Sequence, residues 1–129
     1  MKKSIFLATL LVSLMFVSDS YAEWKKIGTD SSGNTYYLDI DKIKKTNGHI
    51  NYWQLINLSK PTDGYLSARI HLQGNCESFR FKNLTFHFYK KPMGKGAHDT
   101  FTTKDNEWEN PQRNSPGGHV IEAACIIAE

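Results

Sequence analysis

HINYWQLINLS (residues 49–59), YLSARIHLQGNC (65–76) and SFRFKNLTFHFYK (78–90) are three consecutive segments that decide the fold of this chain. Each is rich in β-branched and aromatic residues, and turn-forming residues separate them, so we expect three long β-strands. In the middle segment, apolar residues at even positions from 66 to 72 alternate with Tyr65, Ser67, Arg69 and His71. This period of two is typical of a strand with one buried face.

The first and third segments differ from this simple alternation. Trp53 and Leu55 lie on one side of the first segment, and further apolar residues lie on the other, which is expected for a central strand under a helix. In the third segment the phenylalanine pair 79 and 81 is out of phase with the pair 86 and 88. An extra residue near 82–83 would shift the phase without ending the strand, so we predict a β-bulge there. The alternation places these phenylalanines together, as core.

Residues 1–22 have the features of a secretory signal peptide: two lysines, an apolar run over 5–17 and a small-residue cleavage site at 20–22. A membrane-spanning helix is the alternative, but the apolar run is shorter than the roughly 18 to 20 residues that a span requires. The first cysteine is Cys76, so no cysteine is placed to carry a lipid anchor. We therefore expect an exported domain over residues 23–129, periplasmic or secreted, without stable membrane insertion after cleavage.

Cys76 and Cys125 are the two cysteines of the chain. Export to an oxidising compartment favours a disulfide between them, and closing a loop of that length stabilises a domain by roughly 4 kcal/mol in the chain-entropy model. Two buried free thiols are the alternative. A disulfide would tie the end of the middle segment to the C-terminus.

The sequence before and after the three long segments predicts shorter elements. Residues 24–28 and 35–40 flank a turn-rich stretch and are expected to form a hairpin. Asp39 and Asp41 could cap one helical turn over 42–45, before an Asn-Gly pair reverses the chain. A loop over 90–96 then leads to a strand at about 98–104, and residues 105–114 read as irregular.

The C-terminal segment admits two interpretations. Ser115 and Pro116 suit the N-cap and first turn of a helix, and Val120, Ile121 and Ala124 lie at the spacing of one apolar helical stripe. A strand over 119–127 is the alternative, because two glycines weaken the helix. We favour the helix, since its apolar stripe would carry the second cysteine onto the sheet. The sequence thus predicts one α+β domain.

The order of several short motifs resembles one known family. These motifs are Trp24 near the mature N-terminus, Tyr-Tyr-Leu-Asp at 36–39, Met-Gly-Lys-Gly at 93–96, Trp108, and Ser-Pro at 115–116, followed by a near-terminal cysteine. Together they are similar to the surface-adhesin protein E family of bacterial exported proteins, over residues 23–129. The resemblance implies a mainly antiparallel sheet of about six strands with a C-terminal helix packed on it and one disulfide. It also implies attachment to host matrix or serum proteins, although the family's named adhesin is a lipoprotein and this sequence lacks the lipid-carrying cysteine.

The sequence contains no motif with a catalytic mechanism, so we expect a protein that is not an enzyme and needs no cofactor. His71 and His87 fall on the outer side of neighbouring strands, but their spacing matches no metal-ligand signature, and we predict no metal site. The mature chain carries a net charge of only about +2, which does not indicate a nucleic-acid partner.

A non-catalytic module that binds a protein partner, with host extracellular matrix as the candidate class, is the leading hypothesis. A periplasmic small-ligand-binding protein or an envelope structural component is the alternative. Aromatic and arginine side chains dominate the energetics of protein interfaces. The candidate partner-binding residues are Tyr65, Arg69, Arg80, Lys90, Lys91, Lys95 and Trp108.

Overall fold

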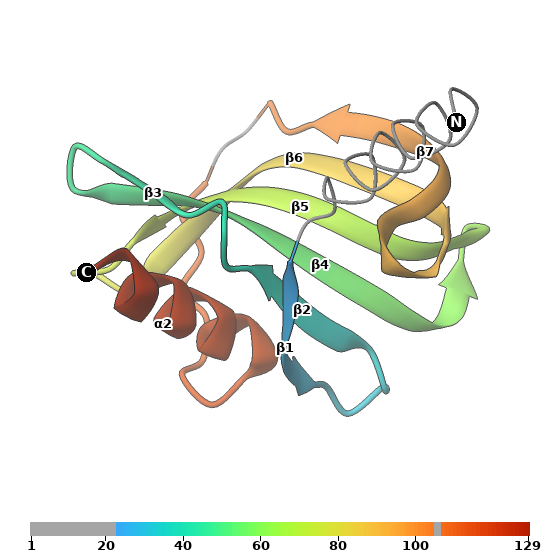
Figure 1. Ribbon diagram of the computed structural model, residues 1–129, viewed down its shortest axis with the longest axis horizontal. Coiled ribbons are helices and arrows are strands. Elements are labelled where there is room, and N and C mark those ends of the chain that lie inside the picture. The colour runs from blue at the N-terminus through green and yellow to red at the C-terminus, as the bar shows by residue number, and fades with distance from the viewer. Residues whose placement is uncertain (1–22, 105–106) are drawn as a thin grey trace, which may run out of the picture.

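A single antiparallel sheet with a helix against one face forms the structure, as Figure 1 shows. The computed structural model describes residues 23–104 and 107–129, so the expected signal peptide and positions 105–106 lie outside the described residues. The elements are β1 (Trp24–Thr29), β2 (Thr35–Asp39), β3 (Lys44–Thr46), β4 (His49–Thr62), β5 (Tyr65–Asn75), β6 (Arg80–Lys91), the 3-10 turn η1 (Pro92–Gly94), β7 (Lys95–Thr102) and the helix α2 (Pro116–Ala128).

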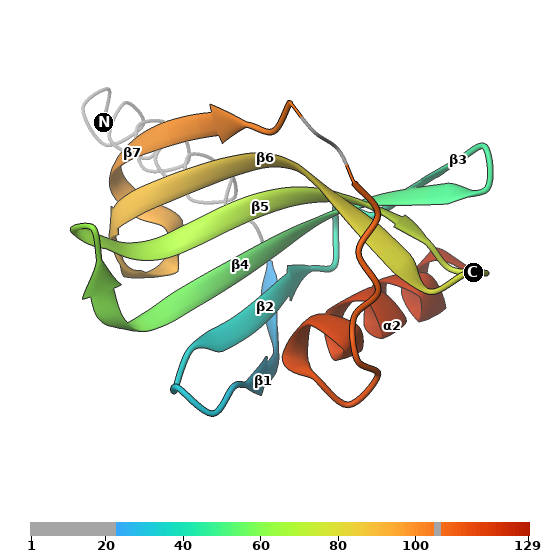
Figure 2. The same ribbon diagram turned by 180° about the vertical axis from the view of Figure 1, so that it is seen from behind.

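The strands follow the order β1-β2-β4-β5-β6-β7. The short strand β3 pairs with residues 49–51 of β4, on the same edge of β4 as β2. Every pairing is antiparallel. The three long strands predicted from the sequence are β4, β5 and β6, and they lie side by side at the centre of the sheet (Figures 1 and 2). The expected α+β fold is therefore confirmed, with seven strands in place of about six.

The helical turn expected over 42–45 is wrong, because that region contains β3. Asp39 accepts a hydrogen bond from the Asp41 amide instead of capping a helix. Asn47 and Gly48 both have positive φ, at 50° and 78°. Two consecutive residues in this conformation make the tight hairpin turn that matches strand twist, so the chain before them pairs with β4. The Asn-Gly reversal itself was predicted correctly.

The predicted bulge lies within a residue or two of its expected place. His71 pairs with Thr85 and Leu72 with Asn83, so Leu84 is the extra residue in β6. Because side chains alternate, this insertion brings Phe81 back to the same face as Phe86. The strand that follows β6 also differs from expectation. It was expected at about 98–104, but β7 begins at Lys95, which pairs with Lys91 on the other side of η1.

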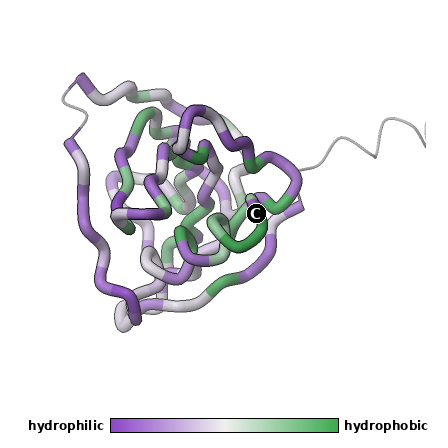
Figure 3. Tube along the Cα trace, turned by 90° about the vertical axis from the view of Figure 1, so that its left-hand side faces the viewer, coloured by the Kyte–Doolittle hydropathy of each residue, from purple (hydrophilic) through white to green (hydrophobic). Residues whose placement is uncertain are grey.

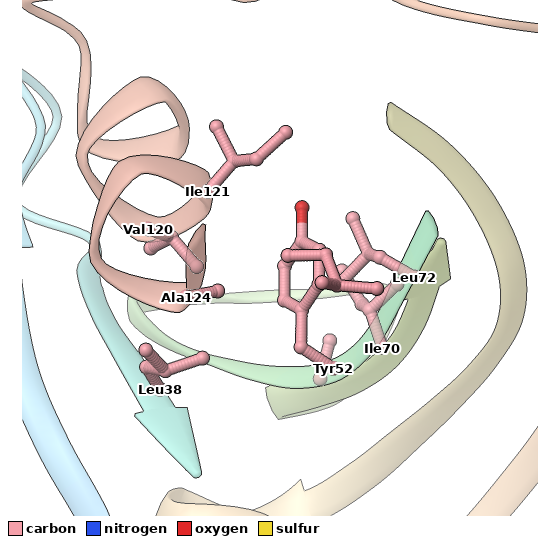
Figure 4. Close-up of a cluster of buried hydrophobic side chains, with 9 residues drawn as sticks. Leu38, Tyr52, Ile70, Leu72, Val120, Ile121 and Ala124 are labelled. Carbon is pink, nitrogen blue, oxygen red and sulfur yellow. The ribbon is translucent and has the colours of Figure 1, made fainter. Parts of the chain in front are cut away.

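The hydrophobic core lies between the helix and the nearest strands (Figure 4). Leu38 of β2 and Tyr52 of β4 are at most 1% exposed, and from α2 they meet Val120, Ile121 and Ala124, each 0% exposed. The strand alternative for the C-terminal segment is thereby excluded. In Figure 3 the tube that leads into the helix is mainly hydrophilic, whereas the helix itself carries several hydrophobic residues.

The start of α2 is built as the sequence indicates. Ser115 is the N-cap, its hydroxyl accepts from the Gly118 amide at 3.1 Å, and Pro116 follows. The predicted disulfide joins Cys76, just after β5, to Cys125 of α2. Among the described residues, no helix is both long and apolar enough to cross a membrane.

Candidate protein-binding surface

The side of the sheet opposite α2, which we call the outer face, carries the candidate site. It is formed by the odd-numbered residues of β4 from His49 to Asn57, whose even-numbered neighbours Ile50 and Tyr52 pack against the helix. Their cross-strand partners continue the face: Trp53 pairs with His71 in β5, and Arg69 of β5 pairs with His87 in β6.

The centre of the outer face is a group of stacked side chains. The rings of Trp53 and His71 lie 4.6 Å apart with an interplanar angle of 16°. The Trp53 and His87 rings lie 5.7 Å apart, and the Arg69 guanidinium carbon is 4.6 Å from the Trp53 ring centre. His98 extends the group towards β7, with its ring 5.7 Å from that of His87. We call these five residues the Trp53 cluster.

One end of the outer face is covered by η1. The Met93 amide donates to the side-chain oxygen of Asn57 at 2.7 Å, and the Gly94 amide donates to the Ser67 hydroxyl at 2.9 Å. These bonds hold the turn down against β4 and β5, so Leu55 and Ser67 beneath it are 0% exposed.

The other end is covered by Trp108. Arg80 and Lys82 of β6 place their charged groups 4.7 Å and 4.5 Å from its ring centre, and the His49 ring lies 5.5 Å away. Backbone hydrogen bonds between Phe81 and Glu109 fix this segment to β6. The Trp53 cluster therefore lies on the strip between η1 and Trp108, which neither of these two segments covers.

Charge on the part of this face formed by β4–β7 has one sign, whereas β2 contributes one buried carboxylate, Asp39, which follows Leu38 of the helix side and is 1% exposed. Strands β4, β5 and β6 contain no aspartate or glutamate. In β7 the single carboxylate, Asp99, pairs with Phe88 and so belongs to the helix side. The ionisable outer-face residues of these strands around the Trp53 cluster and Trp108 are all basic: His49, Arg69, His71, Arg80, Lys82, His87 and His98.

Burial changes the ionisation of the cluster. Partial burial lowers the pKa of His71, and burial lowers that of His87, with further lowering from the charges of Arg69, His98 and His71. The arginines are also partly desolvated, since the Nε atoms of Arg69 and Arg80 are buried and have no hydrogen-bond partner among the described residues. At neutral pH His71 and His87 thus present mainly neutral rings beside the Arg69 guanidinium.

The structure brings only some of the predicted site residues together. Arg69 lies in the Trp53 cluster, and Arg80 contacts Trp108 at one end of the same face. Lys91 and Lys95 are exposed on either side of η1.

Tyr65 and Lys90 lie elsewhere. Tyr65 was expected on the same side as Arg69, but its ring packs 5.4 Å from that of Phe88 on the helix side, and its hydroxyl donates to Asp99. The Lys90 ammonium lies 4.1 Å from the Tyr65 ring centre. The register shifts between Asn57 and Thr62 at this end of the hairpin, which ends the regular alternation.

Trp53, which sequence reasoning treated only as part of a covered strand, is the centre of the site. Its odd position in β4 was a usable signal, because it shares a face with His71 and His87 once the strands pair in register. Among residues 23–104 and 107–129, no group of three histidine, cysteine or acidic side chains is arranged to hold a metal ion.

Comparison with known proteins gives the family. The sequence model described as surface-adhesin protein E matches residues 24–126. The chain belongs to the surface-adhesin protein E family. The resemblance drawn from the sequence is therefore confirmed, and family membership implies an exported or surface protein of the adhesin class.

Solved structures of the same class share the fold. The crystal structure of protein E from non-typeable Haemophilus influenzae is 18% identical, with a TM-score of 0.61 over 85% of this chain and 78% of that one. A second structure of Haemophilus influenzae protein E is also 18% identical, with a TM-score of 0.59 over 84% of this chain and 86% of that one. No curated protein matches this sequence.

Proposed function

We propose that this member of the surface-adhesin protein E family is a non-catalytic module that binds an extracellular protein partner through its outer face. Host matrix and serum proteins are the proposed class of partner. The observation that supports this most strongly is the Trp53 cluster, an aromatic and cationic strip between η1 and Trp108 on which β4, β5 and β6 place no carboxylate.

The composition of the strip is that of an interface centre. Tryptophan and arginine are over-represented among residues whose truncation costs most binding energy, especially where neighbouring groups exclude water. Trp53 is half-buried and held by its neighbours, so little side-chain freedom is lost on binding. The Arg69 guanidinium is held against the Trp53 ring, so a partner's carboxylate would meet a cation that is already oriented.

The basic side chains of β4–β7 on this face support an acidic partner. Basic groups without nearby carboxylates attract an acidic protein surface and accelerate its association. Nucleic acid is also anionic, but single-strand binding requires aromatic rings free to stack on bases. The Trp53 ring already contacts two histidine rings and a guanidinium, which supports a protein partner.

A binding assay with purified residues 23–129 tests the proposal. We expect saturable binding to immobilised laminin or vitronectin that weakens with salt, and no comparable binding to a DNA duplex. Arg69→Gln should weaken binding by roughly tenfold or more, since a hydrogen bond to a charged group contributes about 1.5–3 kcal/mol.

Lys25→Gln is the matched control, because it removes one positive charge from an exposed position of β1 away from the outer face. The proposal fails if both variants bind alike, or if the DNA duplex binds as tightly as the proteins.

We also propose that the mature domain resides in the periplasm or outside the cell without a lipid anchor. The support is the N-terminal apolar run and the absence of a cysteine before Cys76. Cell fractionation with mass measurement of the mature protein tests this: recovery of an acylated form would contradict it, and strictly periplasmic protein would exclude a role in host attachment.

A further inference from the structure

The helix side of the sheet has an open apolar groove that α2 does not cover. It encloses about 490 Å³. Its lining comes from β4 to β7 and from the β4–β5 hairpin. The apolar lining residues are Ile56, Leu58, Ala68, Ile70, Phe86, Phe88 and Phe101.

Aromatic rings form one wall of this groove. Phe86 and Phe88 stand parallel, 5.8 Å apart at 2°, and Phe101 meets Phe88 edge-on at 5.7 Å. Phe101 is 53% exposed and is one of the exposed large hydrophobic residues. Phe86 and Phe88 were predicted as core; both pack against the core cluster but are only half-buried. The groove therefore leaves costly apolar surface in contact with water.

A second cavity of about 370 Å³ continues the groove towards the start of α2. The two cavities share Ile56, Ile70 and Phe86, so they form one channel along the sheet. Gln54 and Gly117 also line this second part, which is the polar end of the channel.

Gln54 is the unexplained group at the polar end. Its side chain is only 7% exposed, and it has no hydrogen-bond partner among the described residues. The other amide there, Asn83, donates to Glu109, and the Ser115 hydroxyl bonds both Gln112 and Gly118. The carboxamide nitrogen and oxygen keep some accessible surface, so a ligand in the cavity that Gln54 lines can hydrogen-bond to them.

The start of α2 lies beside this carboxamide. The thirteen-residue helix directs the positive end of its dipole here, and the Gly117 amide has no partner among the described residues. The charged side chain that lines the apolar part, Asp63, belongs to the β4–β5 hairpin at the opposite end. An anionic group is thus favoured beside Gln54 and disfavoured at the hairpin.

We propose that this channel binds a single-chain amphiphile of the fatty-acid class, with its carboxylate beside Gln54 and the Gly117 amide and its alkyl chain along the phenylalanine wall. Gln54 and Leu58 are four residues apart in β4, about 13 Å along the strand, so the apolar part covers roughly ten carbons of an extended alkyl chain, and a longer chain continues past Leu58 at the open end of the groove. The volumes lie within the range of about 300–1,000 Å³ found for small-molecule sites. This site is separate from the outer face and does not depend on the proposed protein binding.

Calorimetric titration of residues 23–129 with hexadecanoate and with its methyl ester, both below their aggregation concentrations, tests the proposal. We expect one saturable site that prefers the carboxylate by about tenfold or more, since hydrogen bonds to a charged group are the stronger ones. Gln54→Leu should reduce that preference several-fold while the ester binds as before, the Gly117 amide and the helix dipole retaining the remainder. Gln73→Leu makes the same change on the outer face and should leave the preference intact.

Two further variants examine the apolar part. Ala68→Phe fills the groove floor and should abolish binding of both ligands, and Phe101→Ser, at an exposed edge position, should weaken both without favouring either. Circular dichroism verifies that each variant is folded. Absence of saturable binding, or an unchanged carboxylate preference in Gln54→Leu, would overturn the proposal. So would a dimer that Ala68→Phe dissociates and hexadecanoate does not, because the groove would then be an interface between two copies.

Discussion

Removal of the disulfide should cost this domain a large part of its stability while leaving its fold intact. The double substitution of Cys76 and Cys125 by alanine opens a loop of 49 residues. The chain-entropy model gives about 4 kcal/mol for a loop of this length, a substantial share of the roughly 5–15 kcal/mol typical of a domain. The helix should remain in place, because Val120, Ile121 and Ala124 stay buried against the sheet.

Urea unfolding of the oxidised protein and of the double variant, followed by far-ultraviolet circular dichroism, measures the effect. With a slope of roughly 1–3 kcal/mol/M, the midpoint should fall by about 1.3–4 M. Ellipticity before the transition should match that of the parent. A loss below about 1 kcal/mol would refute the reasoning, since it would show that the cross-link hardly restricts the unfolded chain.

Three further predictions concern the helix start and the histidines. Gly118→Ala should destabilise the domain by about 1–3 kcal/mol in thermal unfolding, because the new Cβ would lie 2.1 Å from the Gln112 carbonyl oxygen; an unchanged melting temperature would contradict this. Ser115→Ala should cost about 1 kcal/mol through loss of the N-cap, and Ser115→Asp should restore most of it. The pKa values of His71 and His87 lie below the ordinary 6.5 in the folded protein. As pH falls, these two histidines therefore bind protons at a higher pH in the unfolded state than in the folded state. The free energy of unfolding should fall as pH drops below about 6.5. Proton NMR titration checks this, and a pKa above 6.5 for either ring would oppose it.

Much of the framework was predictable because it depends on short-range patterns. The period of two in β5 and the phase change in β6 correctly gave two strands and a bulge. Ser115 and Pro116 gave the helix start, since capping requires only the residues next to it. The disulfide followed from the presence of two cysteines in an exported chain.

The errors arose where tertiary contacts override local pattern. The alternation in β5 assigned Ser67 to the solvent side, yet it is 0% exposed because η1 folds over it and the Gly94 amide bonds its hydroxyl. Tyr65 was assigned to the outer face, but the register shift in the β4–β5 hairpin moves its ring to the helix side.

The candidate site could be predicted only in part. Arg69 and the outer-face position of His71 and His87 followed from alternation within single strands. The Trp53 cluster needs the register between three strands, which depends on the hairpin turns and the bulge together. The single sign of charge on β4, β5 and β6 is also invisible in the net charge of +3 for the whole chain, because acidic residues in other parts of the sequence offset it.

Mapping the bound surface tests the central claim most directly. Hydrogen–deuterium exchange of residues 23–129, measured by NMR with and without laminin, reports which backbone amides become protected. The account predicts that protection concentrates in β4–β7 around Trp53, Arg69 and His87, and leaves the exposed end of α2 near Ile126 unchanged. Protection of the helix, with none around Trp53, would contradict it.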